Sequence, residues 1–310
     1  MANDISIEDL ALSVASADEL FTKQLKCWAE ACERYQALSG VRNRRIAFDG
    51  FDVVVQFNPA RIVSASAKTD AATLAARPCF LCKKNRPECQ MFVPFADFQL
   101  LVNPFPIFSP HYTIAHREHT QQCISPYVGQ LIAMAERLQG LALFYNGPQC
   151  GASAPDHQHF QACRIDKLPV IADYFRFHNN RTTLVEQSKY AEVRTIENYL
   201  RTVVCIEATT ADALSATILS TLQRLFPDMD KVEPKINLVT TVIKLRYYCW
   251  IFPRAASRPW QYSAPEQQRL LVSPGTVEMA GIVITPIEEH FLRITKDDIA
   301  DIYSQCSMIL

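Results

Sequence analysis

A loop of small residues leads into an alternating series of histidine and glutamine in the middle of this chain. The loop spans Asn146–Ser153 and holds two of the eight glycines in 310 residues. Shortly after it comes the series His157-Gln-His159-Phe-Gln161. Side chains alternate between the faces of a strand, so His157, His159 and Gln161 are expected on one face. The segment therefore predicts a strand that carries two imidazoles and an amide into one pocket.

The residue types of this pocket suit chemistry at phosphorus. A neutral imidazole keeps a lone pair at neutral pH, so it can attack phosphorus without a separate base. A carboxamide beside it can donate to a phosphoryl oxygen, where charge accumulates in the transition state. Gly151 lets backbone N–H groups approach an anion and Ser153 adds a hydroxyl donor, although such residues also serve ordinary turns. A lone histidine is more often a packed or surface residue, but this run is rarely accidental.

A second motif combines two cysteines with histidines further along the chain. Cys79 and Cys82 are separated by two residues, and His119 ends the run His116-Arg-Glu-His119. Two such thiolates form half of a zinc knuckle, and two imidazoles would complete a tetrahedral site. A redox pair is less favoured, because no pattern places these cysteines at a helix start within a β-α-β unit. Spacing alone leaves zinc and two incidental thiols as open alternatives.

Composition excludes several classes of function. The chain has 31 basic and 32 acidic residues, which argues against a broad nucleic-acid surface but not against a local anion site. From the residues at its start we expect no secretory leader, and without a run of about 18 apolar residues we expect no membrane partner. Its eleven cysteines are better interpreted as buried residues or metal ligands than as disulfides. The expected location is therefore cytoplasmic.

Hydrophobic periodicity predicts an α+β chain without a low-complexity linker. Helices are expected over residues 7–39, 125–140, 211–225 and 297–308, the first with a capping-box pattern at Ser16–Glu19. Strands are expected over residues 45–48, 51–57, 61–65, 98–102, 112–115, 141–145, 159–165, 192–207 and, as a pair, 236–252. Residues 77–94 look like an irregular loop. The prediction is one compact unit on a mainly antiparallel sheet with flanking helices.

Three segments together resemble the histidine-triad-like nucleotidyltransferases: Cys79–Cys82, Asn103–His119 and Asn146–Ala162. That superfamily includes galactose-1-phosphate uridylyltransferase, dinucleoside-tetraphosphate phosphorylase and the GDP-L-galactose phosphorylases. Gln161 stands where the hydrolytic members have a third histidine, which marks the transferase branch. The resemblance implies two tandem halves, the second degenerate. We expect an N-terminal helical segment at 1–40, a catalytic half at 41–180 and a degenerate half at 181–310.

The resemblance also implies roles for individual residues. His159 would attack an α-phosphorus and form a nucleotidyl-histidine, while Gln161 steadies the phosphoryl oxygens. Ser153 and Asn146 would contribute to the phosphate cradle. Structural zinc would be held by four ligands: Cys79, Cys82, His119 and His157. A sugar phosphate or inorganic phosphate would then accept the nucleotidyl group.

The second half of the chain resembles these enzymes more weakly. Ile236–Val239 with Tyr248–Arg254 is similar to the degenerate repeat of the phosphorylases, and Pro274–Gly281 to a segment of the GDP-hexose phosphorylases. Arg254 and Arg258 could reach phosphate, which a bidentate guanidinium suits, although arginines beside a proline-rich turn are usually solvated. One departure from the family pattern is Asp156, which is inserted before the first histidine and could orient an imidazole or turn away.

Several functions are consistent with these observations. The leading hypothesis is a nucleotidyltransferase or phosphorylase that moves a nucleoside monophosphate from a sugar nucleotide or dinucleoside polyphosphate to phosphate or a sugar phosphate. A nucleotide hydrolase of the same fold, a sugar-nucleotide-binding protein without catalysis and a zinc-dependent interaction module are the alternatives. A homodimer could form, as it does in relatives, but no periodicity exposes an interface. Base and sugar preference depend on pocket side chains that sequence does not place.

Overall fold

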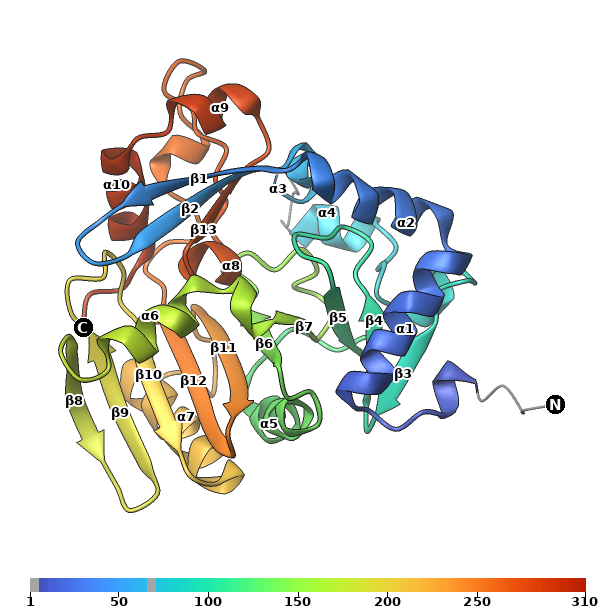
Figure 1. The fold of residues 1–310 in the computed structure, drawn as a ribbon, viewed down its shortest axis with the longest axis horizontal. Coiled ribbons are helices and arrows are strands. Elements are labelled where there is room, and N and C mark those ends of the chain that lie inside the picture. The colour runs from blue at the N-terminus through green and yellow to red at the C-terminus, as the bar shows by residue number, and fades with distance from the viewer. Residues whose placement is uncertain (1–5, 66–70) are drawn as a thin grey trace.

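A single ten-stranded antiparallel sheet organises the chain in the computed structural model, which describes residues 6–65 and 71–310. The strand order is β3-β4-β5-β7-β6-β11-β12-β10-β9-β8, and every neighbouring pair runs antiparallel. Helices flank this sheet (Figure 1). The predicted α+β class with a mainly antiparallel sheet is therefore confirmed.

The sheet consists of two five-stranded sets with the same connectivity. The first set is β3 Phe92–Phe95, β4 Phe98–Val102, β5 His111–His116, β6 Leu141–Asn146 and β7 His159–Arg164. The second is β8 Thr182–Gln187, β9 Ala191–Ile196, β10 Val204–Ala208, β11 Ile236–Ile243 and β12 Arg246–Pro253. Helix α5 (Val128–Arg137) precedes β6 as α7 (Ala211–Leu225) precedes β11. The sets meet where Asn146 of β6 lies opposite Asn237 of β11.

The two sets differ in the connection between their last two strands. In the first set, residues 147–158 connect β6 to β7, whereas residues 244–245 alone connect β11 to β12. The second set therefore repeats the topology without the small-residue loop Asn146–Ser153, which we call the glycine loop. It also lacks the series of histidine and glutamine that follows this loop in the first set. This is the degenerate half that the resemblance implied.

Both faces of the large sheet are covered, because alternate residues of its central strands enter different cores. In β6, Leu143 and Tyr145 pack in the core that includes α5 and α7, whereas Ala142 and Phe144 pack in the other. The second core lies beneath a three-stranded sheet of β1 Arg42–Ala47, β2 Asp52–Phe57 and β13 Ile282–Thr285. Helices α6, α8, α9 and α10 complete this layer, at Pro169–Phe177, Thr276–Met279, Glu288–Arg293 and Lys296–Cys306.

The small sheet links the beginning of the chain to its end. Strand β13 runs parallel to β2, with Ile282 opposite Val54. The sheet thus draws strands from both expected ranges, 41–180 and 181–310. A boundary near residue 180 separates the halves of the large sheet but passes through the small one.

The N-terminal segment is helical but not one helix. It comprises η1 Ile7–Asp9, α1 Val14–Cys27, α2 Ala29–Gln36 and η2 Ala37–Gly40. The expected capping box at Ser16–Glu19 is wrong by three residues, because Ser13 is the N-cap and its hydroxyl accepts the N–H of Ser16 at 3.1 Å. Trp28 leaves helical geometry between α1 and α2, with φ −122° and ψ 93°. The break separates α1, which packs on β3 and β4, from α2, whose Tyr35 reaches the carbonyl of His111 at the start of β5.

Other expected elements differ from the structure in type or in bounds. The strand expected at 61–65 is helical, as η3 Pro59–Arg61 and α3 Ile62–Ala65, because Pro59 starts a helical turn. The strand expected over 192–207 is two strands, β9 and β10, with a turn between them. The helix expected over 125–140 is η5 Ser125–Tyr127 followed by α5. The region expected as a loop holds η4 Lys83–Asn85 and the start of β3, and α4 Ala71–Ala76 precedes it.

Across residues 6–65 and 71–310, none of the helices combines the length and the apolar character that crossing a membrane requires.

Candidate functional site

His159, the expected nucleophile, is the first residue of β7 and is buried. Its Nδ1 lies 2.8 Å from the main-chain oxygen of His157, so in the neutral ring Nδ1 carries the proton and donates to that carbonyl. Nε2 is then left with the lone pair. Burial lowers the pKa of His159 to about 4, so the ring is neutral at neutral pH. The geometry presents a fixed tautomer with Nε2 as the free nitrogen.

The backbone of His159 is held by one side chain, that of Gln122. Its Oε1 accepts the N–H of His159 at 2.7 Å, and its Nε2 donates to the carbonyl of His159 at 2.9 Å. The same Nε2 lies 3.0 Å from the carbonyl of Asn146. The β6–β7 pairing reaches only Phe144 opposite Gln161, so Gln122 satisfies backbone groups that have no strand partner there. Gln122 therefore fixes the start of β7 against the end of β6.

Gln161 is oriented by His111, a residue that no sequence pattern had indicated. The Nε2 of His111 lies 2.9 Å from the Oε1 of Gln161, and the N–H of Ile107 donates to His111 Nδ1 at 3.2 Å. Since Nδ1 accepts, Nε2 carries the proton and donates to the amide oxygen. Burial, together with the charge of Arg61, lowers the pKa of His111 to about 3, so this donor stays neutral. The amide nitrogen of Gln161 consequently points away from His111 with its donors available.

The N-terminal helices hold the proline-rich segment that leads to His111. The hydroxyl of Tyr35 in α2 lies 2.8 Å from the carbonyl of His111 and 3.1 Å from that of Asn103, the two ends of this segment. Arg34 donates to the carbonyl of Pro104 at 3.1 Å. Helix α2 thus belongs structurally to the first half, which gives the N-terminal segment a position that its sequence did not reveal.

The glycine loop is packed tightly against a segment from the end of the chain. Gly151 has φ +91°, and a Cβ built on it would lie 2.6 Å from the Cα of Gly275. Neither the conformation nor the close approach tolerates a side chain. Ser153 follows with its carbonyl bonded to Arg77 at 3.0 Å. The loop is therefore held between Gly275, which packs against Gly151, and Arg77, which donates to the carbonyl of Ser153.

Asn146 is positioned by residues of the second half. Its Oδ1 accepts from the side chain of Asn237 at 2.9 Å, and from the N–H and hydroxyl of Thr276 at 2.7 and 2.8 Å. These contacts occupy the oxygen, so the amide nitrogen is the group that Asn146 can offer to an anion.

Arg254 is buried, and its guanidinium donates hydrogen bonds to several segments of the second half. Its five N–H groups donate to the side chain of Asn237 and to four carbonyls, those of Pro274, Cys306, Ala256 and Ser257. No donor remains for a phosphate, which corrects the role expected for Arg254. It acts instead through Asn237, which positions Asn146. Arg258 is half-buried over the ring of Tyr262, with its Nε donating to Ser273 at 3.0 Å.

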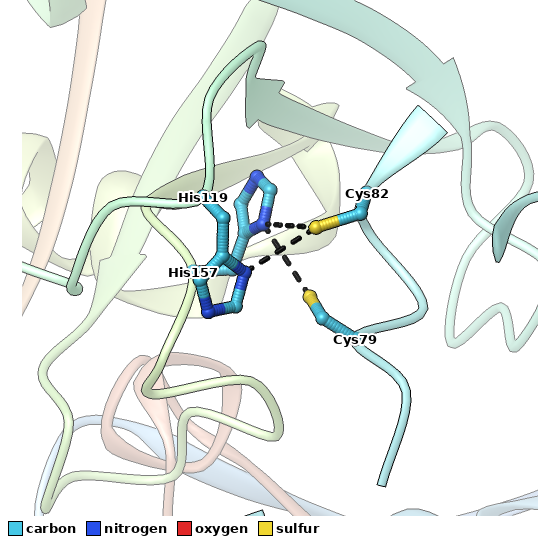
Figure 2. Close-up of side chains that lie close together, drawn as sticks. All are labelled: Cys79, Cys82, His119 and His157. Atoms are coloured by element: carbon cyan, nitrogen blue, oxygen red, sulfur yellow. Dashed lines mark hydrogen bonds between the residues drawn. The ribbon is translucent and has the colours of Figure 1, made fainter. Parts of the chain in front are cut away.

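The four expected metal ligands come together (Figure 2). The ligand atoms of Cys79, Cys82, His119 and His157 all lie within 4.8 Å of one another. His157 Nδ1 is 3.4 Å from Cys79 Sγ, and His119 Nδ1 is 3.3 Å from Cys82 Sγ. His157 Nε2 faces the carbonyl of His116 at 2.8 Å, which leaves Nδ1 as the ligating nitrogen. This group could hold a metal ion.

The placement of His157 corrects one expectation. His157 precedes β7 and does not share a strand face with His159 and Gln161, because its backbone is still in the turn that follows Ala154. Its imidazole is in the cysteine cluster and not in the pocket of the nucleophile. The alternation expected over three positions therefore holds for the two residues within the strand.

Comparisons with known proteins agree with this architecture. A domain family described only as of unknown function, DUF4922, matches residues 20–164, which run from α1 to the end of β7. The structure of the yeast Ap4A phosphorylase Apa2 superimposes with a TM-score of 0.56 at 17% identity, covering 91% of this chain and 94% of that one. Its complex with Ap4A gives 0.55 at 15% identity, covering 91% and 97%.

A DUF4931 family protein from Bacillus cereus is also similar, at 17% identity and a TM-score of 0.40 over 59% of this chain and 93% of its own. No curated protein sequence matches the chain. At these identities, the likeness to the phosphorylase concerns the fold.

Proposed function

We propose that this chain, which has a histidine-triad-like fold shared with a nucleotide phosphorylase, transfers a nucleoside monophosphate through a covalent intermediate on His159. The observation that carries the proposal is that His159 and Gln161, two residues apart on β7, both have side chains in fixed orientations. His159 has its lone pair on Nε2, because Nδ1 donates to His157. Gln161 has its amide donors free, because His111 donates to its oxygen.

In the first step, His159 Nε2 bonds to the α-phosphorus of the nucleotide. The bond from that phosphorus to the bridging oxygen of the leaving group breaks, and the oxygen keeps the electron pair. The Nδ1 proton stays on the ring, where the carbonyl of His157 stabilises the positive charge of the phosphorylated imidazole. The amide of Gln161 and the backbone of the glycine loop donate to the phosphoryl oxygens as charge develops.

In the second step, an oxygen of the acceptor attacks the same phosphorus. The phosphorus–nitrogen bond breaks and its electron pair returns to Nε2, which restores the neutral imidazole. The acceptor is inorganic phosphate or a sugar phosphate. A dinucleoside polyphosphate, the type of compound bound in the yeast phosphorylase complex, or a sugar nucleotide is the donor.

Zinc is the metal that the cysteine–histidine cluster suits. Two thiolates and two imidazole nitrogens form a donor set typical of tetrahedral structural zinc sites. When bound, zinc would supply no group to the reaction but would tie the loop of Cys79 and Cys82 to His119 and His157. A homodimer and a cytoplasmic location remain predictions.

Covalent labelling tests the proposal. Protein incubated with nucleotides labelled at the α-phosphorus, including Ap4A and nucleoside-diphosphate hexoses, should retain acid-labile and base-stable label. The His159→Ala variant should retain none, whereas His178→Ala, which removes a histidine near Glu207, should label normally. Wild-type protein that labels with none of these nucleotides would overturn the covalent mechanism.

Product analysis separates transfer from hydrolysis. When an acceptor is added, labelled protein should release its nucleotide as a new phosphoanhydride: a nucleoside diphosphate with inorganic phosphate, or a nucleoside-diphosphate hexose with a hexose phosphate. In water alone the release should be slow. Release at the same rate without an acceptor would favour the nucleotide hydrolase.

A further inference from the structure

Asp156 lies between the glycine loop and the cysteine–histidine cluster and contacts residues of both. It stands directly before the metal-ligand candidate His157, three residues after Ser153. Its side chain is about one-fifth exposed. The function proposed above assigns it no role.

One oxygen of Asp156 faces a member of the cluster. Asp156 Oδ2 lies 3.8 Å from His119 Nε2, while His119 Nδ1 faces Cys82 at 3.3 Å. A histidine that ligates a metal through one nitrogen commonly directs its other N–H toward a carboxylate, which fixes the ring and raises its basicity. His157 already has such a partner in the carbonyl of His116. His119 is half-exposed, and the Asp156 carboxylate is a charged group that faces its Nε2.

The other oxygen of Asp156 reaches the glycine loop through Arg77. Arg77 Nη2 lies 3.2 Å from Asp156 Oδ1 and 3.0 Å from the carbonyl of Ser153. Arg77 is itself close to the cluster, because it precedes Pro78 and Cys79 in the chain. With side-chain exposures of 25% and 20%, Arg77 and Asp156 are less screened than a pair on the open surface.

We propose that Asp156 is a positioning residue that couples metal binding in the cluster to the order of the glycine loop. The carboxylate holds His119 in its ligating orientation and holds Arg77 on Ser153 at the same time. Occupancy of the cluster therefore favours the conformation in which Arg77 holds the carbonyl of Ser153. The coupling is reciprocal, so a phosphate ligand that orders the loop strengthens metal binding by the same factor. This inference rests on the metal site of the proposed function and not on its transfer chemistry.

Metal affinity provides the first test. Zinc dissociation constants, measured by competition with a chromophoric chelator, should be about 10- to 100-fold weaker for Asp156→Asn than for wild type. Glu118→Gln is the matched control, because it removes an exposed carboxylate from the same hollow, which also contains His119. It should bind zinc within about threefold of wild type, since the orienting carboxylate is intact. Equal affinities of the Asp156→Asn and Glu118→Gln variants would overturn the role toward His119.

Hydrogen exchange provides the second test, without any nucleotide. Zinc should slow amide exchange over residues 151–154 of the wild type, and this protection should disappear in Arg77→Gln at saturating zinc. Arg77 is not a ligand, so zinc binding by that variant shows that its cluster is intact. Protection that persists in Arg77→Gln would overturn the coupling. A wild type that binds zinc but forms no nucleotidyl-histidine would end the transfer proposal and leave this one standing.

Discussion

The imidazole of His111 donates from Nε2 to the side-chain oxygen of Gln161 at 2.9 Å, across a sequence separation of 50 residues. The N–H of Ile107 holds the opposite nitrogen of the same ring. A freely rotating amide could present either its oxygen or its nitrogen to a substrate. Because His111 is fixed as a donor, Gln161 presents nitrogen, which is the end that a phosphoryl oxygen requires. Four predictions follow from this and from the other buried contacts.

Replacing His111 should impair the chemical step more than binding. In His111→Phe the ring packs similarly but cannot donate, so Gln161 loses its fixed orientation. The rate of nucleotidyl transfer to His159 should fall by about 10²-fold, similar to the loss of one oriented donor to a developing oxyanion, with little change in nucleotide affinity. Single-turnover labelling measures the rate and equilibrium dialysis the affinity. Equal loss in both would show that His111 is needed for binding and not for orienting the amide.

The pH below which labelling of His159 slows should be lower than for an ordinary imidazole. Burial lowers the pKa of His159 to about 4, so Nε2 remains unprotonated at all higher pH values. Initial labelling rates should be flat from about pH 5.5 to 8 and fall tenfold per unit below about pH 4. A rate that halves near pH 6.5, the value of an ordinary imidazole, would contradict the burial of this ring.

Glu233 should make the protein less stable as the pH rises toward neutrality. It accepts from the hydroxyl of Tyr145 at 2.7 Å and the N–H of Ile124 at 2.9 Å, and burial raises its pKa to about 7. The folded state therefore binds a proton that the unfolded state has released above pH 4.5, so stability is fully present below that value and is lost as the pH rises through 7.

Glu233→Gln tests this dependence, because it keeps the acceptor oxygen without the charge. Relative to wild type, the variant should gain on the order of 3 kcal/mol at pH 8 and little at pH 4.5, by urea unfolding. The control Glu266→Gln, at an exposed position, should show no such trend. A gain that is independent of pH would exclude ionisation of Glu233 as the cause.

Arg254→Lys should destabilise the fold although it conserves charge. Lysine has three donors in place of the five that Arg254 uses, so at least two buried acceptors lose their partners. A loss of at least about 3 kcal/mol is expected in urea unfolding. Arg258→Lys, at a half-buried site, should cost less than about 1 kcal/mol. Similar small losses of stability in Arg254→Lys and Arg258→Lys would mean that water hydrogen-bonds to the acceptors that Arg254 leaves.

The local sequence was sufficient to predict where several side chains of the candidate site lie. A strand after a small-residue loop follows from residue types alone, so His159 and Gln161 were correctly placed on β7. The four cysteines and histidines of the cluster were predicted from spacing and family resemblance, and they do come together. The α+β class and two similar halves follow from periodicity and that resemblance. These features are properties of short segments, whose pattern is written in consecutive residues.

The tertiary structure decided which distant residues reach those segments. Periodicity assigns a side chain to a face but does not say which strand lies beside it, so neither His111 nor Gln122 was found. For the same reason Arg254, which looked like a phosphate ligand beside a turn, is a buried support for Asn237 and Asn146. His157 left the predicted strand face because β7 begins two residues later than the alternation implied. Such contacts depend on the order of strands in the sheet, which is set by the packing of the whole chain.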